Sequence, residues 1–392
     1  MAKAREDLAP VAEGRITEDA LAKFRARIGM KLRVGNIYNQ YVNPDSIRHY
    51  VDGIGDLNPL YRDAEYAGNT RYGNLIAPPS WLYGVFPTWV LQGLPGVHAF
   101  HSGNDWEIYK PIYNGDVITP EAIFTGFDEK PSKFAGKMIM EYQEARYYNQ
   151  LGELVARAKS WLVRAERVAA RERGKYADIQ LPHPWTEEEL RRVEEDVLAE
   201  EVRGSDVCFW EDVRVGEELK PVVKGPLGLT DMIAFCAGAA PVQLLAHGLS
   251  LRLYQKHPAW GVRDKQTGAM EPVYSVHYNK SVANAVGLPY PYDVGAQRQC
   301  WLFHLLTNWI GDEGWIKRNY AEYRKFVYLS DAVRFTGRVT RKYIDEDGEY
   351  CVDIETHGFN QRGEDTIPGR STVALPSREA GFRPLESRIR KP

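Results

Sequence analysis

The sequence predicts an α+β protein built from two copies of one domain. The chain has 392 residues, which is enough for two domains of ordinary size. Motifs of the first half return in the second half at a nearly constant displacement. In each half, a helix-rich segment is followed by a series of strands separated by turns. These three observations together predict tandem domains that share one plan.

The repeated motifs occur in the same order in both halves. Tyr61 precedes Pro79 by 18 residues, and His277 precedes Gly295 by the same distance, 216 positions later. Further along, Lys110, Tyr113 and Asp116 return as Lys325, Tyr328 and Asp331, and residues 149–153 (NQLGE) return as residues 360–364 (NQRGE). Chance does not explain such an ordered series of matches, so we infer a duplication.

The predicted elements divide the chain into four parts. Thr17 is suited to an N-cap, and the residues after it have a helical pattern. The four parts are an N-terminal helical extension (1–30), a first domain (31–165), a charged helical linker (166–204) and a second domain (205–380) with an insertion near 239–270. Acidic and basic residues alternate in the linker, which indicates a solvated helix.

Each domain is expected to contain a short helix, a buried helix and strands. In the first domain these are residues 44–51, a helix from Pro78 that is apolar all round, and strands to about residue 165. In the second they are residues 231–235, a buried helix from Val294, and strands to residue 375. The insertion adds about 30 residues ahead of His277 and could form part of a substrate tunnel or a lid.

The composition excludes several classes of protein. With 50 basic and 53 acidic residues the net charge is −3, so nothing favours a nucleic-acid or anionic-membrane partner. The first residues lack the apolar core of a signal peptide, and no uncharged apolar run is long enough to span a membrane. The four cysteines have no Cys-x-x-Cys spacing. A reduced, cytoplasmic location is therefore expected.

A buried helix wrapped by an antiparallel sheet and duplicated in one chain is the double-hotdog layout. The chain resembles the MaoC-like dehydratase family, which includes R-specific enoyl-thioester hydratases. The family pattern is Gly-Asp-x-Asn-Pro-x-His, followed 18 residues after the His by a Gly that opens the central helix. The Pro-Ile-x-x-Gly-Asp turn at residues 111–116 strengthens the resemblance, which covers roughly residues 30–165 and 205–376.

The resemblance implies reversible hydration or dehydration of a 2-enoyl or 3-hydroxyacyl thioester of CoA or acyl carrier protein, without a metal or redox cofactor. This chemistry needs a base that activates water and a proton for the α-carbon. It also needs a donor for the negative charge that grows on the thioester oxygen. A backbone N–H at a helix N-terminus is suited to that task.

The family residues are divided between the two halves. The first half keeps Asp56, but it has Tyr61 in place of the His and Pro79, which has no N–H, in place of the Gly. The second half has His277 and Gly295, but Ala239 stands where the Asp is expected. Neither half alone contains the whole family site.

The resemblance predicts three catalytic residues, each with an ordinary alternative. His277 is the main acid–base group. Asp56 is a base or water holder, or else a turn carboxylate that caps nearby amides. Gly295 supplies the oxyanion N–H, or else allows close packing of the helix. The predicted substrate-binding residues are Asn58, Tyr61, Trp81, His101, Asp293, Gln297 and Arg298.

For several of these residues a structural role is the stronger alternative. Asn58 could shape its loop, Tyr61 could be a packed aromatic residue, and Arg298 could simply pair with Asp293. His98 and His101 do not indicate a metal site, because three-residue spacing on a strand sends them to opposite faces. His304 lies in an apolar run and is expected to be a core residue.

Two other functions remain open at this point. Both half-sites could have decayed, leaving a non-catalytic protein that binds an acyl group or another ligand. The fold could also serve different acid–base chemistry, such as an isomerisation or the dehydration of a specialised metabolite. A fused pair already mimics the usual hotdog dimer, so both a monomer and a homo-oligomer are compatible with the sequence.

Overall fold

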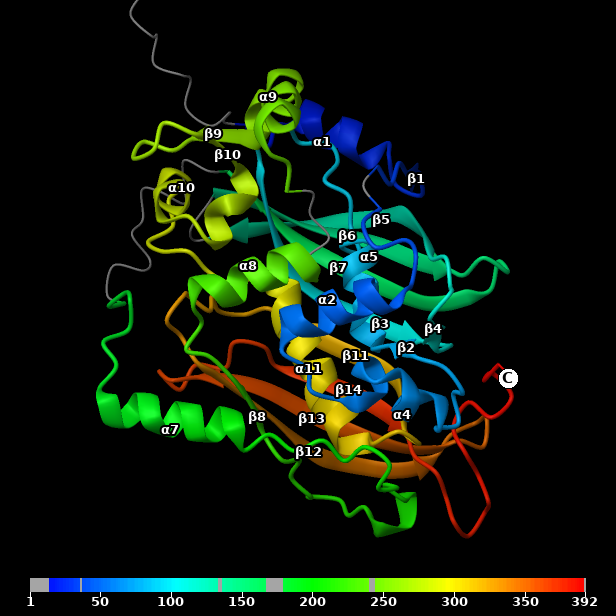
Figure 1. Ribbon diagram of the computed structural model, residues 1–392. Helices are drawn as coiled ribbons and strands as arrows, with labels where there is room; N and C mark the ends of the chain where they lie inside the picture. Colours follow the sequence, from blue (N-terminus) through cyan, green and yellow to red (C-terminus); the bar gives the residue numbers. More distant parts are fainter. Residues whose placement is uncertain (1–13, 36, 133–135, 167–178, 240–243, 391–392) are drawn as a thin grey trace, which may run out of the picture.

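One antiparallel sheet runs through both halves of the protein (Figure 1). The computed structural model describes residues 14–35, 37–132, 136–166, 179–239 and 244–390. Within them the sheet has ten strands in the order β1-β5-β6-β7-β3-β11-β14-β13-β12-β8. The first five belong to the first half and the last five to the second, and β3 pairs with β11 where they join. This architecture confirms the predicted α+β class and the double-hotdog layout.

The strands have one face buried against helices. In β12, residues 333, 335, 337 and 339 are buried while the residues between them are not, which is the period of two expected for such a sheet. The bounds of the main strands are β1 (Lys31–Leu32), β3 (His98–Ile108), β5 (Thr119–Ser132), β6 (Gly136–Tyr148), β7 (Leu154–Ala165), β8 (Val222–Lys224), β11 (Trp315–Glu322), β12 (Val333–Ile344), β13 (Tyr350–Asn360) and β14 (Gly369–Ala374). Two small sheets pair β2 (Ile76–Ala77) with β4 (Ile112–Tyr113), and β9 (Gly261–Arg263) with β10 (Met270–Pro272).

The central helices of the two halves differ in length. In the second half, α11 (Gly295–Ile310) is buried along its whole course after the first residue. In the first half, the counterpart consists of the 3-10 turn η1 (Pro79–Trp81) and α5 (Leu82–Val85). It ends at Phe86, whose backbone is extended because Pro87 follows it. The long helix expected in both halves is therefore present only in the second.

Two helices hold the halves together in direct backbone contact. They are α2 (Pro44–Ile54) and α8 (Leu229–Gly238). A Cβ atom on Gly238 would lie 2.1 Å from the carbonyl oxygen of His49, and one on Gly53 would lie 2.8 Å from that of Ala234. Both glycines are thus required for the close approach of these helices.

The remaining helices flank this core. Thr17 caps α1 (Glu18–Arg25) as predicted. The others are α3 (Pro59–Arg62), α4 (Ala64–Gly68), α7 (Glu187–Leu198), α9 (His247–Lys256), α10 (Lys280–Ala285) and the 3-10 turns η2 (Trp210–Asp212), η3 (Pro258–Trp260) and η4 (Val273–His277). Parts of the predicted extension, linker and insertion (1–13, 167–178 and 240–243) lie outside the described residues, and the predicted domain boundaries stay predictions.

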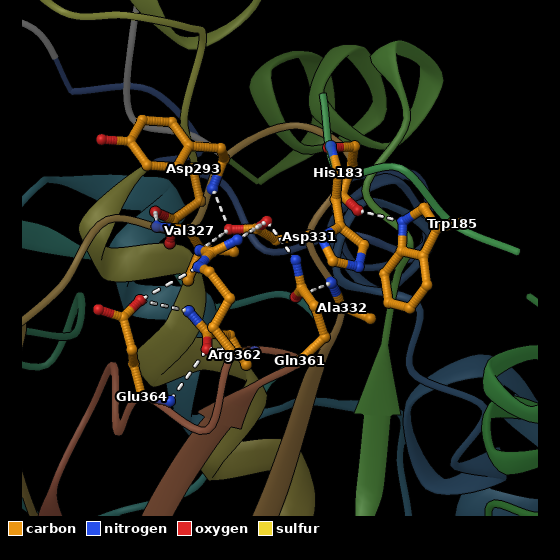
Figure 2. A network of polar contacts seen from close by, with 12 residues as sticks. His183, Trp185, Asp293, Val327, Asp331, Ala332, Gln361, Arg362 and Glu364 are labelled. Carbon is orange, nitrogen blue, oxygen red and sulfur yellow. Dashed lines mark hydrogen bonds and ion pairs between the residues drawn. The ribbon is translucent and has the colours of Figure 1, made fainter. Parts of the chain in front are cut away.

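The repeated turn motifs make equivalent hydrogen bonds in the two halves. Asp116 and Asp331 each accept a backbone N–H and a glutamine amide. The bonds are Tyr113 N to Asp116 Oδ2 (2.9 Å) and Gln150 Nε2 to Oδ1 (3.0 Å), and Tyr328 N to Asp331 Oδ2 (2.9 Å) and Gln361 Nε2 to Oδ1 (2.6 Å). Figure 2 shows the second turn, in which Arg362 also pairs with Asp331 at 2.7 Å. This agreement supports the inferred duplication.

Candidate functional site

His277 is held beside the N-terminus of α11. It is the last residue of η4, and its Nδ1 atom lies 2.9 Å from the carbonyl oxygen of Tyr292, three residues before the helix begins. The rings of Tyr274 and Tyr292 contact the imidazole edge-on, each with a centroid distance of 4.7 Å. The packing fixes the orientation of the His277 ring.

The hydrogen bond to Tyr292 selects the tautomer of His277. A carbonyl oxygen can only accept, so Nδ1 carries the hydrogen and Nε2 carries the lone pair of the neutral ring. Burial lowers the pKa of His277 to about 4. The hydrogen bonds of the ring to the backbone favour the charged form and raise the pKa, but burial outweighs them. The imidazole is therefore neutral at pH 7 and has the form that a general base requires.

Gly295 is the first residue of α11 and follows by three residues the Tyr292 carbonyl that binds His277. The N-cap residue, Val294, has no side chain that can cap the first amides of the helix. The N-terminus of a 16-residue helix favours negative charge. A Cβ atom on Gly295 would lie only 2.7 Å from the ring of Tyr323, so the glycine is also needed for packing. The geometry is compatible with both roles considered for Gly295.

Two buried polar atoms near this helix start make no hydrogen bond within the described part of the chain. They are Oε1 of Gln297 and Nε2 of His101. His101 comes from β3 of the first half, and its ring packs edge-on against Tyr323, which in turn contacts the Gly295 position. Burial lowers the pKa of His101 to about 3. The first half therefore contributes a neutral imidazole close to the start of α11.

Asp293 and Arg298 serve the structure. Arg298 Nε donates to Asp293 Oδ2 at 2.6 Å, and its Nη1 donates to the carbonyl oxygens of Lys325 and Thr366. Asp293 is completely buried, and Arg298 is nearly so. The pairing that was the stronger alternative for Arg298 is thus present in the structure.

Asp56 lies at a different point along α11. Its Oδ1 atom accepts the amide of Asn58 at 2.9 Å, as expected of a turn carboxylate, and lies 3.5 Å from Nε2 of His304. His304 follows Gly295 by nine residues, which is about 13 Å along a helix axis. Asp56 and His277 therefore approach α11 at separate places.

Asp56 belongs to a buried charged cluster that the sequence did not reveal. Glu200, from the linker, lies 2.7 Å from Nε2 of His304 and 3.5 Å from Nζ of Lys224. Lys224 also donates to the carbonyl oxygen of Gly55 at 2.7 Å. His304 is a core residue as predicted, although its Nδ1 makes no bond within the described residues. No motif or spacing connects these residues in the sequence.

The first half retains a cavity near its own family residues. Its volume is about 20 Å³, room for about one water molecule, and its walls come from both halves. Tyr61 and Pro79 line it on one side, and Thr307 and Ile310 of α11 on the other. Burial raises the pKa of the Tyr61 hydroxyl well above its usual range. At the two family positions the cavity thus has Tyr61 in place of a histidine, and Pro79, which has no N–H to donate.

Two further predicted residues lie outside this cavity wall. Asn58 accepts the amide of Leu60 at 3.0 Å and so shapes its loop. Trp81 is fully buried in the core, with its indole N–H directed at the carbonyl oxygen of Ser46. Among the described residues, no cluster of His, Cys, Asp or Glu is arranged to hold a metal ion. The helices in that part of the chain are too short or too polar to cross a membrane.

His277 and His101 predict a stability that depends on pH. Their folded pKa values, about 4 and about 3, lie below the unfolded value of 6.5, so the unfolded chain binds more protons as the pH falls. Stability should be full above pH 6.5 and decrease toward pH 4, by on the order of 3 kcal/mol for His277. Urea unfolding followed by tryptophan fluorescence at several pH values measures this slope. The His277→Gln variant should have a shallower slope, and an unchanged slope would contradict the assignment.

Comparison with known proteins agrees with the fold. Residues 26–158 match the model of the FAS1-like dehydratase domain region. A solved MaoC-like dehydratase superposes with a TM-score of 0.60 at 17% identity, covering 90% of this chain and 99% of that one. The chain has the MaoC-like double-hotdog fold. The resemblance to the MaoC-like dehydratases is thereby confirmed, and the dehydratase match falls on the half that contains Asp56.

Two sequence relatives add to this result. A UPF0336 protein of Streptomyces avermitilis is 27% identical over 129 residues, which is 31% of this chain and 83% of that protein. A probable enoyl-CoA hydratase alpha subunit of Thermomonospora curvata is 33% identical over 76 residues, 19% of this chain and 23% of the relative. The second of these relatives is named as a hydratase subunit, so part of this chain is similar to a hydratase.

Proposed function

We propose that the second half of this MaoC-like protein catalyses the reversible hydration of a 2-enoyl thioester to a 3-hydroxyacyl thioester. One observation carries the proposal. The bond between Nδ1 of His277 and the carbonyl oxygen of Tyr292 puts the lone pair of the neutral ring on Nε2, near the N-terminus of α11. A base and a group of backbone donors are the two elements that this reaction requires.

In the hydration direction, Nε2 of His277 takes a proton from water while the water oxygen bonds to C3 of the substrate. The electrons of the C2=C3 bond move toward the thioester oxygen, which becomes an enolate. The first amides of α11, beginning with Gly295, stabilise that charge. The His277 imidazolium then returns its proton to C2, and the carbonyl forms again. Dehydration follows the same steps in reverse.

A single acid–base group accounts for both proton transfers. The family carboxylate is absent from the second half, where Ala239 ends α8 and is buried. Asp56 does not replace it, because Asp56 contacts His304 well inside α11. His101 and Gln297 carry the unpartnered buried polar atoms near the helix start, and we assign them to substrate contact.

We assign no catalytic step to the first half. Its cavity is lined mainly by apolar side chains and has Tyr61 and Pro79 at the family positions. A cavity of about 20 Å³ holds about one water molecule and not an acyl chain, and it has no group that titrates near neutral pH at the expected place.

The proposal is tested with a panel of 2-enoyl-CoA substrates, following the loss of enoyl absorbance. We expect His277→Gln to lower kcat at least 100-fold, since removal of a general acid–base group has effects of about this size. His49→Gln, at an exposed histidine, is the matched control and should retain full activity. Wild type that turns over no member of the panel, or an active His277→Gln variant, would contradict the proposal.

A further inference from the structure

The insertion of the second half presents a mixed apolar and basic surface. Leu249, Arg252 and Lys256 are exposed and follow at i, i+3 and i+7 on α9, so they form one stripe along the helix. Trp260, 44% exposed, follows α9 in the 3-10 turn η3. We call these four residues the α9 stripe. Leu249 is 66% exposed and is the apolar residue of the stripe on the helix itself.

The charge around the stripe is opposite in sign to that of the whole protein. Residues 244–280 contain five basic and two acidic side chains, whereas the chain as a whole has a net charge of −3. The five basic side chains are all exposed, and within the described residues none of them forms an ion pair with a carboxylate. One of the acids, Asp264, is buried and bound to Asn279 at 2.9 Å. The surface is therefore locally positive.

This surface is attached directly to the segment that carries His277. The ring of Tyr254 on α9 packs against Gly261 of the β9–β10 hairpin. Strand β10 continues into η4, and η4 ends at His277. In Figure 1, α9, the hairpin and α10 lie together at one end of the molecule. The first half, which lacks the histidine, also lacks the insertion.

We propose that the α9 stripe is the docking surface for an acidic carrier protein that presents the acyl thioester to the second-half site. The inference rests on the proposed function and names its partner. Exposed cations without an ion-pair partner attract and orient a negatively charged protein. Leu249 and Trp260 supply the apolar anchors that protein interfaces place among polar residues.

The arrangement favours a protein over the nucleotide of CoA. Arg252 and Lys256 project from the convex side of a helix, one turn apart, with an apolar residue on the same stripe. A nucleotide is normally held in a concave site with converging polar groups. A helix face with alternating apolar and basic residues fits the flatter surface of a folded partner.

The test compares two forms of one substrate, a crotonyl group carried by a bacterial acyl carrier protein or by CoA. We expect the double variant Arg252→Glu/Lys256→Glu to lose at least about tenfold in kcat/KM for the carrier-bound form, with the CoA form within about twofold. The loss should shrink in high salt, because screening weakens attraction between exposed charges. The matched control is Arg214→Glu/Arg338→Glu, a reversal of two exposed arginines that form no ion pair within the described residues.

Each outcome decides between the alternatives. An unchanged kcat/KM for the carrier-bound substrate overturns the inference. An equal loss with both substrates also overturns it and assigns the stripe to CoA. If wild type acts on neither substrate, the proposed function fails. The docking surface is then tested by binding alone: unloaded carrier protein is titrated against wild type and the double variant, and fluorescence anisotropy measures the binding. Salt-sensitive binding that the variant loses supports it, and no binding to wild type overturns it.

Discussion

Replacing Arg164 by methionine is expected to lower the free energy of unfolding by about 3–5 kcal/mol. Arg164 lies on β7 and donates from Nη1 to Oε2 of Glu141 at 2.6 Å, and both side chains are only 1% exposed. Loss of the guanidinium leaves the Glu141 carboxylate buried without a counter-charge. A buried unpaired charge costs far more than an exposed one.

Arg164 also compensates for the shortened central helix of the first half. Its two terminal nitrogens donate to the carbonyl oxygens of Gln92 and Leu94, each at 3.2 Å. Those residues belong to the loop that follows α5 and leads to β3. In this non-helical loop the arginine supplies a donor to the Gln92 carbonyl, and at Leu94 it shares the carbonyl with the amide of Val97 at 3.2 Å.

Urea unfolding at pH 7 measures the effect, with Arg157→Met as the control. Arg157 lies on the same strand and pairs with Glu107, but both side chains are about 30% exposed, so a loss of about 1 kcal/mol or less is expected. The double variant Glu141→Gln/Arg164→Met should recover part of the loss, because it removes the uncompensated charge. Equal losses for Arg164→Met and Arg157→Met would refute the role of burial.

The fold could be predicted from the sequence because motifs that occur twice at a constant displacement indicate two domains with the same plan. Asp116 and Asp331 were paired by their displacement alone, and the structure gives them the same amide and glutamine contacts. The short helix of the first half was missed, although its cause is visible in the sequence. Pro87 disfavours a helical conformation at Phe86, whereas α11 contains no proline.

The candidate site could be predicted only in part. The contact between His277 and Tyr292 places the histidine at the helix start, where the family spacing put it. The surroundings of Asp56 could not be foreseen, since its partners come from distant segments that share no motif. Glu200 was included in a linker interpreted as solvated, yet its side chain is only 5% exposed. Charge patterns describe the average environment of a segment, and one buried residue can depart from it.

Replacing Glu200 by alanine is therefore expected to destabilise the protein by about 3–5 kcal/mol. The carboxylate is the common partner of His304, Asn308 and Lys224, at 2.7, 3.1 and 3.5 Å. Its loss leaves the Lys224 ammonium, which is largely buried, without an opposite charge at that distance. Glu201→Ala is the matched control, because the neighbouring carboxylate is 71% exposed and should contribute about 1 kcal/mol or less.

The dependence of stability on pH in the acid range distinguishes a charge role of Glu200 from simple packing. Burial alone would raise the pKa of Glu200, but the hydrogen bond and charge of His304 and the charge of Lys224 outweigh it and hold the pKa at about 2. Because the folded value lies below the unfolded value of 4.5, the stabilisation is full above pH 4.5 and is lost as the pH falls toward 2. The difference in unfolding free energy between wild type and Glu200→Ala should shrink over that range. A difference that stays constant down to pH 2 would mean that Glu200 stabilises the protein by packing and not by its charge.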